Sequence, residues 1–420
     1  MSAFDKIIGY EPIKEELRQL CDMIHHRDIY DKLGAKMPKG LLLYGEPGIG
    51  KTLMAHSFIQ ESGRKAYIIR RNKHAGDFID EIKRVFLEAA GNAPSIILLD
   101  DMDKFVVEEK SREEYVTVQA CIDELNDADV YVISTANDLD DIPDSLLRAG
   151  RFDRKIRVES PKGDDAAKII RHYIASKSVE NGLCVDDIAK MLKGKSCADL
   201  ETLLNEAALY AGFERCEKIS MKHFVRAVLR NEYGASESVM AVDTATLEAI
   251  AYHEAGHVAV SELQLPGSIG LASLRTRNNR NGPGGFVIRC ADIKNSTQKV
   301  QIHLAGNVAT ELKYGIATEG GSEDIRRAVE SVKESVIYNA ICGVGALDIF
   351  SRYDNTSDDL RARQEAIIHA EIERFAMQTR QMLVKNMGFL DTVAAALLEK
   401  ETLLHSDIQS LREGFLKETA

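Results

Sequence analysis

A pair of histidines four residues apart is the first feature of this sequence that could do chemistry. Residues 252–257 read YHEAGH, and the surrounding stretch TLEAIAYHEAGHVAVSEL is rich in good helix formers. On a helix, side chains four residues apart lie on one face, so His253 and His257 can bind one zinc ion through their ring nitrogens. Glu254 would then act as general base toward a water molecule that zinc acidifies. The pattern therefore indicates metal-assisted hydrolysis.

A zinc ion of this kind needs a third protein ligand. Acidic residues that could supply it lie further along the chain, and spacing alone does not choose among them: Glu319, Glu323, Asp324 and Glu330. The alternative interpretation is that both histidines lie on the surface of an ordinary helix and bind nothing.

A glycine-rich segment has the pattern of a phosphate-binding loop. Residues 45–52 read GEPGIGKT, which matches G-x-x-x-x-G-K-T with Gly45, Gly50, Lys51 and Thr52 at the fixed positions. The glycines allow successive backbone N–H groups to point at phosphate oxygens, and the helix expected over 53–60 directs its positive end at the anion. Lys51 would reach the β- and γ-phosphates of ATP, and Thr52 would offer its hydroxyl to Mg²⁺. The loop residues between them complete the predicted nucleotide site: Pro47, Gly48 and Ile49.

Polar residues that could complete this site follow two further apolar segments. Residues 95–103 read SIILLDDMD, and carboxylates that follow a strand of a parallel sheet emerge at its ligand-binding edge. Asp100 is the candidate Mg²⁺ ligand, and Asp101 is the candidate that orients the attacking water. Asn137 follows the apolar segment 130–134 and could place its amide near the γ-phosphate.

Two arginines in LLRAGRFDR, residues 146–154, have two interpretations. Arg151 and Arg154 either belong to a solvated basic loop or stabilise transition-state charge in a neighbouring subunit, as arginine fingers do.

The elements that must position these residues can be predicted from the apolar pattern. Short apolar segments at 40–44, 66–69, 95–99 and 130–134 alternate with helical patterns, which is typical of βαβ units and a mostly parallel sheet. From about residue 164 the pattern becomes helical, apart from a possible strand pair between 267 and 288. We therefore predict an α/β nucleotide-binding subdomain over 1–160, a small helical subdomain over 161–232, a linker over 233–240 and a mainly helical domain over 241–420.

Composition restricts the classes of partner. The 420 residues include 54 basic and 66 acidic side chains, a net charge of −12, and no tryptophan, which argues against nucleic acid as the main partner. The seven cysteines are scattered without a C-x-x-C pair, which favours reduced thiols and a cytoplasmic location. No segment approaches about 18 uninterrupted apolar residues, so we expect no membrane-spanning helix.

Taken together, the motifs resemble the cytosolic part of the FtsH-type AAA+ zinc metalloproteases along nearly the whole chain. The stretches that carry the resemblance are KLGAKMPKGLLLYGEPGIGKTLMA, SLLRAGRFDR, CADLETLLNEAALYAG, AYHEAGH, GGSEDIRRA and KNMGFLDTVAAALLEKETL. The resemblance implies a Rossmann-like P-loop AAA+ ATPase core with a small helical lid, followed by a mainly α-helical zinc metalloprotease domain. It also implies one zinc ion per chain, ATP, Mg²⁺ and polypeptide substrates.

The resemblance further assigns roles to individual residues. Asp324 falls at the position of the third zinc ligand, and Asn137 falls at the first sensor of the ATPase. Arg151 and Arg154 fall at the arginine fingers, which implies a homohexameric ring with ATP between subunits. The remaining implied contacts are with the adenine base: Ile8, Gly9 and His172.

Two departures from the family pattern bear on function. Asp101 stands where the family usually has Glu, which shortens the side chain by one methylene and favours slow ATP hydrolysis. The loop over 70–81, RRNKHAGDFIDE, lacks the aromatic–apolar–glycine pattern of the family's pore loop, and its bulky candidates are His74 and Phe78. We therefore expect an ATP-dependent zinc endopeptidase of cytosolic proteins. The alternative is an ATP-regulated ring, acting as a chaperone or an assembly switch, with weak unfolding power, whose protease cuts only unstructured polypeptides.

Overall fold

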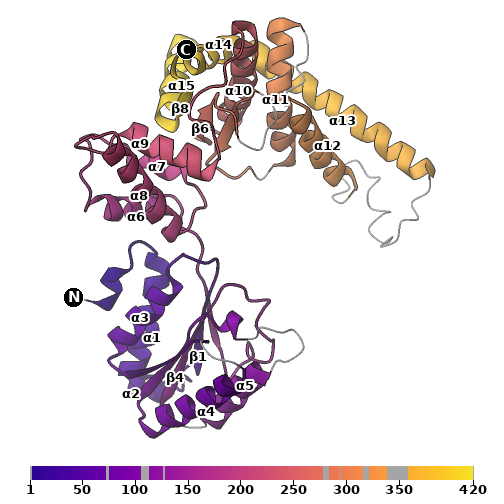
Figure 1. Cartoon of the computed structure of the whole chain (residues 1–420). Helices are drawn as coiled ribbons and strands as arrows, with labels where there is room; N and C mark the ends of the chain where they lie inside the picture. Colours follow the sequence, from indigo (N-terminus) through magenta and orange to yellow (C-terminus); the bar gives the residue numbers. More distant parts are fainter. Residues whose placement is uncertain are drawn as a thin grey trace. The chain divides into compact units, whose positions relative to one another are not determined.

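The computed structural model describes residues 2–71, 75–105, 113–125, 128–277, 283–293, 295–315, 321–337 and 358–419. The chain forms two compact units (Figure 1). The first comprises Met1–Ser178 with Gly194–Asn205, and the second comprises Val179–Lys193 with Glu206–Ala420. The three boundaries predicted from the sequence, between the segments 1–160, 161–232, 233–240 and 241–420, remain predictions.

A five-stranded sheet with the order β2-β3-β4-β1-β5 forms the centre of the first unit, and all of its strand pairs are parallel. Its strands are β1 (Gly40–Tyr44), β2 (Lys65–Ile69), β3 (Ser95–Leu99), β4 (Val130–Ala136) and β5 (Arg154–Arg157). The four apolar segments predicted as strands are β1 to β4, which confirms the α/β prediction. The sequence analysis missed β5, because three of its four residues are charged and only Ile156 is buried.

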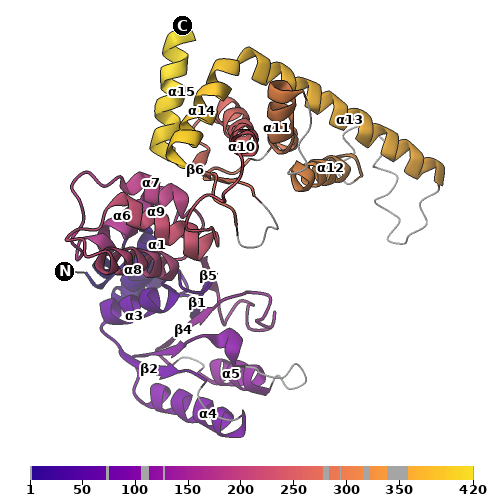
Figure 2. The same cartoon turned by 45° about the horizontal axis from the view of Figure 1, so that its top comes forward.

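Helices cover both faces of this sheet (Figure 2). One face packs on α4 (Ala75–Gly91) and α5 (Glu113–Glu124), whose buried residues form one hydrophobic cluster with the sheet. The other packs on α3 (Lys51–Ser62), where Phe58 stacks on Tyr131 of β4 with ring centroids 5.7 Å apart. Neighbouring residues of a strand point to opposite faces, so uninterrupted apolar strands are what a sheet covered on both sides requires. The remaining helices of this unit are 3₁₀ turns at Ala3–Lys6 and Met102–Lys104, α1 (Glu11–His25), α2 (Arg27–Lys32), α6 (Asp164–Ile174) and the first part of α8 (Cys197–Phe213).

The second unit is mainly helical and has one small antiparallel sheet with the order β7-β6-β8. Its centre is α10 (Thr244–Gln264), which begins where the Asp243 side chain accepts a hydrogen bond from the Thr246 amide at 2.9 Å. Every residue of α10 from Ala251 to Glu262 is buried. The elements around it are α11 (Ser296–Tyr314), α12 (Ser322–Ile337), α13 (Asp358–Lys385), α14 (Met387–Lys400), α15 (His405–Thr419), β6 (Ile269–Ser273), β7 (Phe286–Arg289) and β8 (Thr402–Leu404).

Three shorter elements also belong to this unit: α7 (Val185–Met191), α9 (Met221–Ala227) and a π-helical turn at Val228–Glu232. Buried side chains of α10, α11, α13 and α14 form its main hydrophobic cluster. Among the residues that the structure describes, no helix combines the length and apolar character needed to cross a membrane.

Candidate active sites

The histidine pair and one acidic residue form a compact triangle of ligand atoms in the second unit. The Nε2 atoms of His253 and His257 lie 3.2 Å apart, and Oδ2 of Asp324 lies 3.2 Å from the first and 3.4 Å from the second. Ligand atoms about 2.0–2.1 Å from a tetrahedral zinc ion lie about 3.3–3.4 Å from one another. The donor set and its spacing therefore fit one zinc ion, with a fourth position left for water or substrate.

The backbone of α11 holds both imidazoles in place. Nδ1 of His257 donates a hydrogen bond to the carbonyl oxygen of Ile302 at 2.7 Å, so Nε2 keeps its lone pair for a metal. The His253 ring lies against Gly306, where a methyl group added to the glycine would come within 2.5 Å of the ring. Close approach of α10 and α11 thus depends on the missing side chain at residue 306.

The charges of the triangle support each other. Burial opposes ionisation of Asp324, but hydrogen bonds and charge from the two imidazoles outweigh it and hold the pKa of this carboxyl far below its usual range. Burial also disfavours a charged His257, yet contact with Asp324 raises the pKa of the ring above its ordinary value. An anionic oxygen next to two imidazole nitrogens is a ligand set suited to a dication.

The structure places the four candidate third ligands differently. Only Asp324, in the first turn of α12, reaches the histidines among the candidates within the described residues. Both oxygens of Glu323 accept hydrogen bonds from arginines: Oε1 accepts from Arg326 at 2.7 Å and Arg327 at 3.0 Å, and Oε2 accepts from Arg326 at 3.0 Å. Glu330 lies 3.4 Å from Arg326, and Glu319 falls outside the described residues.

A cavity of about 390 Å³ opens beside the triangle. Glu254, His257 and Asp324 line it, and Glu254 is 4% exposed. Further polar residues of this cavity come from separate elements and were not predicted as site residues; they include Arg277, Arg289, His303 and Arg327.

The nucleotide motif lines a second cavity, of about 510 Å³, in the first unit. Predicted residues that line it are Ile8, Pro47, Gly48, Ile49, Gly50, Lys51, Thr52, Asp101, Asn137 and His172. Lining residues that the sequence analysis missed include Tyr10, Tyr173 and Cys197. Three other predicted residues do not line the cavity: Gly9, Gly45 and Asp100. Gly9 has a φ of +73° and packs so closely on Asp165 that a side chain at residue 9 would collide with that aspartate.

A polar network connects the ends of β1, β3 and β4 at this cavity. Nζ of Lys51 donates to the carbonyl oxygens of Gly45 and Glu46 at 2.6 and 2.8 Å and to Oδ1 of Asn137 at 2.9 Å. Oδ1 of Asp100 accepts hydrogen bonds from the hydroxyls of Thr52 at 3.0 Å and Thr135 at 2.8 Å. The carboxyl ends of parallel strands meet at one sheet edge, which explains why residues distant in sequence converge here.

Cations hold the two acids after β3. Arg70, which is 60% exposed, makes an ion pair with the second oxygen of Asp100, whose side chain is only 1% exposed. Burial would raise the pKa of Asp100, but hydrogen bonds from Thr135, Arg70 and Thr52 outweigh it and keep the pKa below its ordinary value. Asp101 has a left-handed backbone conformation, with a φ of 55°, and its carboxylate accepts from Lys104 at 2.8 Å. Arg70 was not recognised in the sequence as part of this site.

The candidate arginine fingers do not line the nucleotide cavity of their own chain. Arg151 pairs with Asp123 at 2.7 Å, and Arg154 pairs with Glu16 at 3.0 Å. In the candidate pore loop, Phe78 is fully buried, and its ring centroid lies 4.9 Å from that of Phe105. His74 falls outside the described residues.

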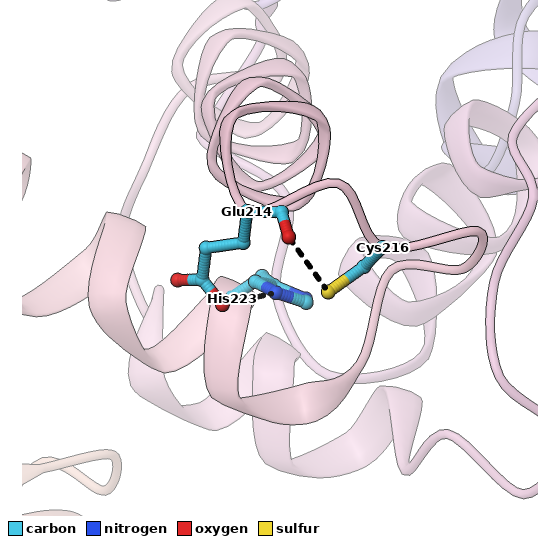
Figure 3. Close-up of side chains that lie close together, drawn as sticks. All are labelled: Glu214, Cys216 and His223. Carbon is cyan, nitrogen blue, oxygen red and sulfur yellow. Dashed lines mark hydrogen bonds and ion pairs between the residues drawn. The ribbon is translucent and has the colours of Figure 1, made fainter.

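A second group of possible metal ligands lies where α8 leads into α9. Figure 3 shows Glu214, Cys216 and His223 close together there. Glu214 is already paired with Lys222 at 2.9 Å and Arg226 at 3.0 Å, and Lys222 is the main reason that its pKa is lowered. Two cations on the only carboxylate disfavour a metal ion at this position.

Comparison with known proteins finds two families that match successive parts of the chain. Residues 41–160 match the ATPase family associated with various cellular activities (AAA), and residues 240–411 match peptidase family M41. An ATP-dependent zinc metalloprotease FtsH of Leptotrichia buccalis is 30% identical over 98% of this chain, which spans 57% of that relative. An ATP-dependent zinc metalloprotease FtsH 1 of Alkaliphilus metalliredigens is 28% identical over 98% of this chain and 74% of its own length. A third, from Ureaplasma parvum, is 28% identical, and this chain spans 60% of it.

Proposed function

Since the chain belongs to the FtsH-type family, with an AAA ATPase domain followed by a family M41 peptidase domain, we propose that it is an ATP-dependent zinc endopeptidase of cytosolic proteins. The observation that carries the proposal is the triangle formed by His253, His257 and Asp324, whose edges of 3.2 to 3.4 Å suit tetrahedral zinc. Three further parts belong to this proposal. Assembly into a homohexameric ring rests on the family resemblance, use of Mg²⁺ rests on the phosphate-loop motif and the resemblance, and a cytoplasmic location rests on the scattered cysteines.

Bound zinc would supply Lewis acidity that polarises the scissile carbonyl and acidifies the attacking water. The residues of the chain itself divide the remaining tasks. His253, His257 and Asp324 would hold the ion, and Ile302 would orient His257 through its carbonyl oxygen. Glu254 follows His253 on α10 and faces the same cavity, so its carboxylate would take the proton from the attacking water and pass it to the leaving amine.

In the ATPase domain, we propose that Lys51 binds the phosphates and that Thr52 and Asp100 hold Mg²⁺. Lys51 donates a hydrogen bond to Asn137, the candidate sensor, so both side chains would contact the γ-phosphate. The pairing of Arg151 and Arg154 with acids of their own chain is compatible with a role toward a neighbouring subunit, in which these ion pairs would open.

Cleavage of casein by the purified, zinc-loaded chain, with and without ATP, tests the proposal. Glu254→Gln keeps the size of the side chain and removes the base, so we expect full zinc content and loss of cleavage. His257→Ala should lose both. Cleavage that persists in the Glu254→Gln variant would contradict the mechanism.

One observation favours the second candidate function, an ATP-regulated ring, acting as a chaperone or an assembly switch, that cuts only unstructured polypeptides. Phe78 is buried in the core, so within the described part of the 70–81 loop no aromatic side chain is available to grip a substrate. A folded reporter with an unstructured tail separates the two functions. ATP-dependent destruction of the folded reporter supports the unfolding protease, and survival of the reporter while casein is cut supports the regulated ring.

A further inference from the structure

An arginine of the small sheet faces the proposed zinc site. Arg289 is the last residue of β7, which pairs with β6 at one edge of the three-stranded sheet. Its half-buried side chain lines the same cavity as Glu254, His257 and Asp324. A residue in this position is within reach of a polypeptide that enters the cavity for cleavage.

Within the described residues of the chain, the charge of Asp324 attracts the guanidinium of Arg289 but forms no ion pair with it. No hydrogen bond or ion pair engages its guanidinium there, whereas the other arginines of the cavity are engaged. Arg327 bonds to Glu323 at 3.0 Å, and Arg277 lies over the ring of Phe286 at 4.4 Å. A half-buried guanidinium without a partner is unfavourable unless a ligand supplies one.

None of the three acids that line the cavity, Glu254, Glu323 and Asp324, forms an ion pair with Arg289. Asp324 is directed at the two imidazoles of the zinc site, and Glu323 is held by two arginines. Burial, followed by repulsion from Arg327, lowers the pKa of Arg289, and attraction by Asp324 opposes this shift. An arginine side chain still carries its charge at neutral pH.

His303 adds no charge of its own on this side of the cavity. Burial, followed by the charge of Arg289, lowers the pKa of His303 to about 4, so this ring is neutral at neutral pH. A neutral imidazole can accept or donate a hydrogen bond without adding a charge. The fixed positive charges on this side of the cavity are therefore those of arginines.

We propose that Arg289 binds a carboxylate of the substrate beside the scissile bond, so that the protease prefers sites with an acidic residue there. The guanidinium presents a planar pair of donors that matches a carboxylate, and the partly dehydrated cavity strengthens such an ion pair. Lysine or arginine at the same substrate position would be repelled. This inference rests on the proposed peptidase function and names its substrate preference.

Matched quenched fluorescent peptides test the inference on the full zinc-loaded chain. One set of peptides carries Glu, Gln or Lys at each position on either side of the cleaved bond. A second set carries either a free or an amidated C-terminus. Comparing the two sets distinguishes binding of a side-chain carboxylate from binding of the terminal carboxylate. We expect kcat/KM to be about 10-fold higher for the carboxylate member of one set. In Arg289→Gln this ratio should fall to about one, and in Arg289→Lys it should be partly kept because the charge remains.

Arg363→Gln is the matched control, because Arg363 on α13 is 70% exposed, pairs with Asp359 and does not line the cavity. It should leave the ratio unchanged. Binding of the same labelled peptides to Glu254→Gln, measured by fluorescence anisotropy, gives a second readout without turnover. Cleavage without any carboxylate preference, or a preference that survives in Arg289→Gln, would overturn the role of Arg289. Absence of cleavage of every peptide and of casein by the zinc-loaded wild type would instead contradict the proposed function.

Discussion

Removal of the Asp324 carboxylate tests the proposed zinc site most directly. In Asp324→Ala, two of the three atoms that form the triangle remain, those of His253 and His257. Four-ligand zinc sites in small peptides have apparent binding free energies of about 10–16 kcal/mol, so one ligand contributes roughly 3 kcal/mol. We therefore expect zinc affinity to fall by at least about 100-fold.

Competition with a chromophoric chelator measures this affinity, and the neighbouring Glu323→Ala provides the control. Glu323 lines the same cavity but accepts hydrogen bonds from Arg326 and Arg327. Removal of its carboxylate should therefore change zinc affinity by less than about 3-fold. Circular dichroism and thermal unfolding show whether either variant is folded. Wild-type affinity in Asp324→Ala, or a loss confined to Glu323→Ala, would refute the assignment of the ligands.

Three further predictions concern the charged or titratable side chains Arg70, Asp101 and His303. Arg70 pairs with Asp100, so it should compete with Mg²⁺ for this carboxylate. In Arg70→Gln, the increase in affinity for a fluorescent ATP analogue on adding Mg²⁺ should be about 10-fold larger than in the wild type, and an equal increase would contradict this competition. Asp101→Glu extends the carboxylate by about 1.5 Å and should raise the rate of ATP hydrolysis, measured by phosphate release, by up to about 100-fold. A slower variant would show that the shorter aspartate, held by Lys104, is the better residue for hydrolysis at this position. His303 has a pKa of about 4 in the folded chain against an ordinary 6.5, so the unfolded chain is protonated first as pH falls, and the free energy of unfolding should decrease between about pH 6.5 and 4. His303→Gln should flatten this decrease, measured by denaturant unfolding at several pH values, and the same decrease in both proteins would contradict the prediction.

Local patterns in the sequence were sufficient to predict the parts of both sites that lie on single elements. The spacing of His253 and His257 is a property of one helix, and the phosphate-loop motif lies between one strand and the helix that follows. The buried strands were also predictable, since a sheet covered on both faces requires continuous apolar segments. The short or charged strands β5 and β8 lack this signal and were missed.

Other parts of the sites depend on contacts between distant segments. Asp324 lies 71 residues after His253, and only the packing of α10, α11 and α12 brings it to the histidines rather than Glu323, its neighbour. Family resemblance had identified this position, whereas residue spacing could not. Arg70 and Arg289 follow or end strands without any motif, so their approach to Asp100 and to the zinc site became visible only in three dimensions.

The contact of His253 with Gly306 has a consequence for how a metal ion is acquired. Close packing against Gly306 restricts rotation of the His253 ring before any ion arrives, and the hydrogen bond to the carbonyl oxygen of Ile302 restricts rotation of the His257 ring. The entropy of ordering these ligands is thus lost when the helices pack, and not when the ion binds. A chelator should then remove zinc and leave the helical domain folded, unlike zinc fingers, which unfold without their metal.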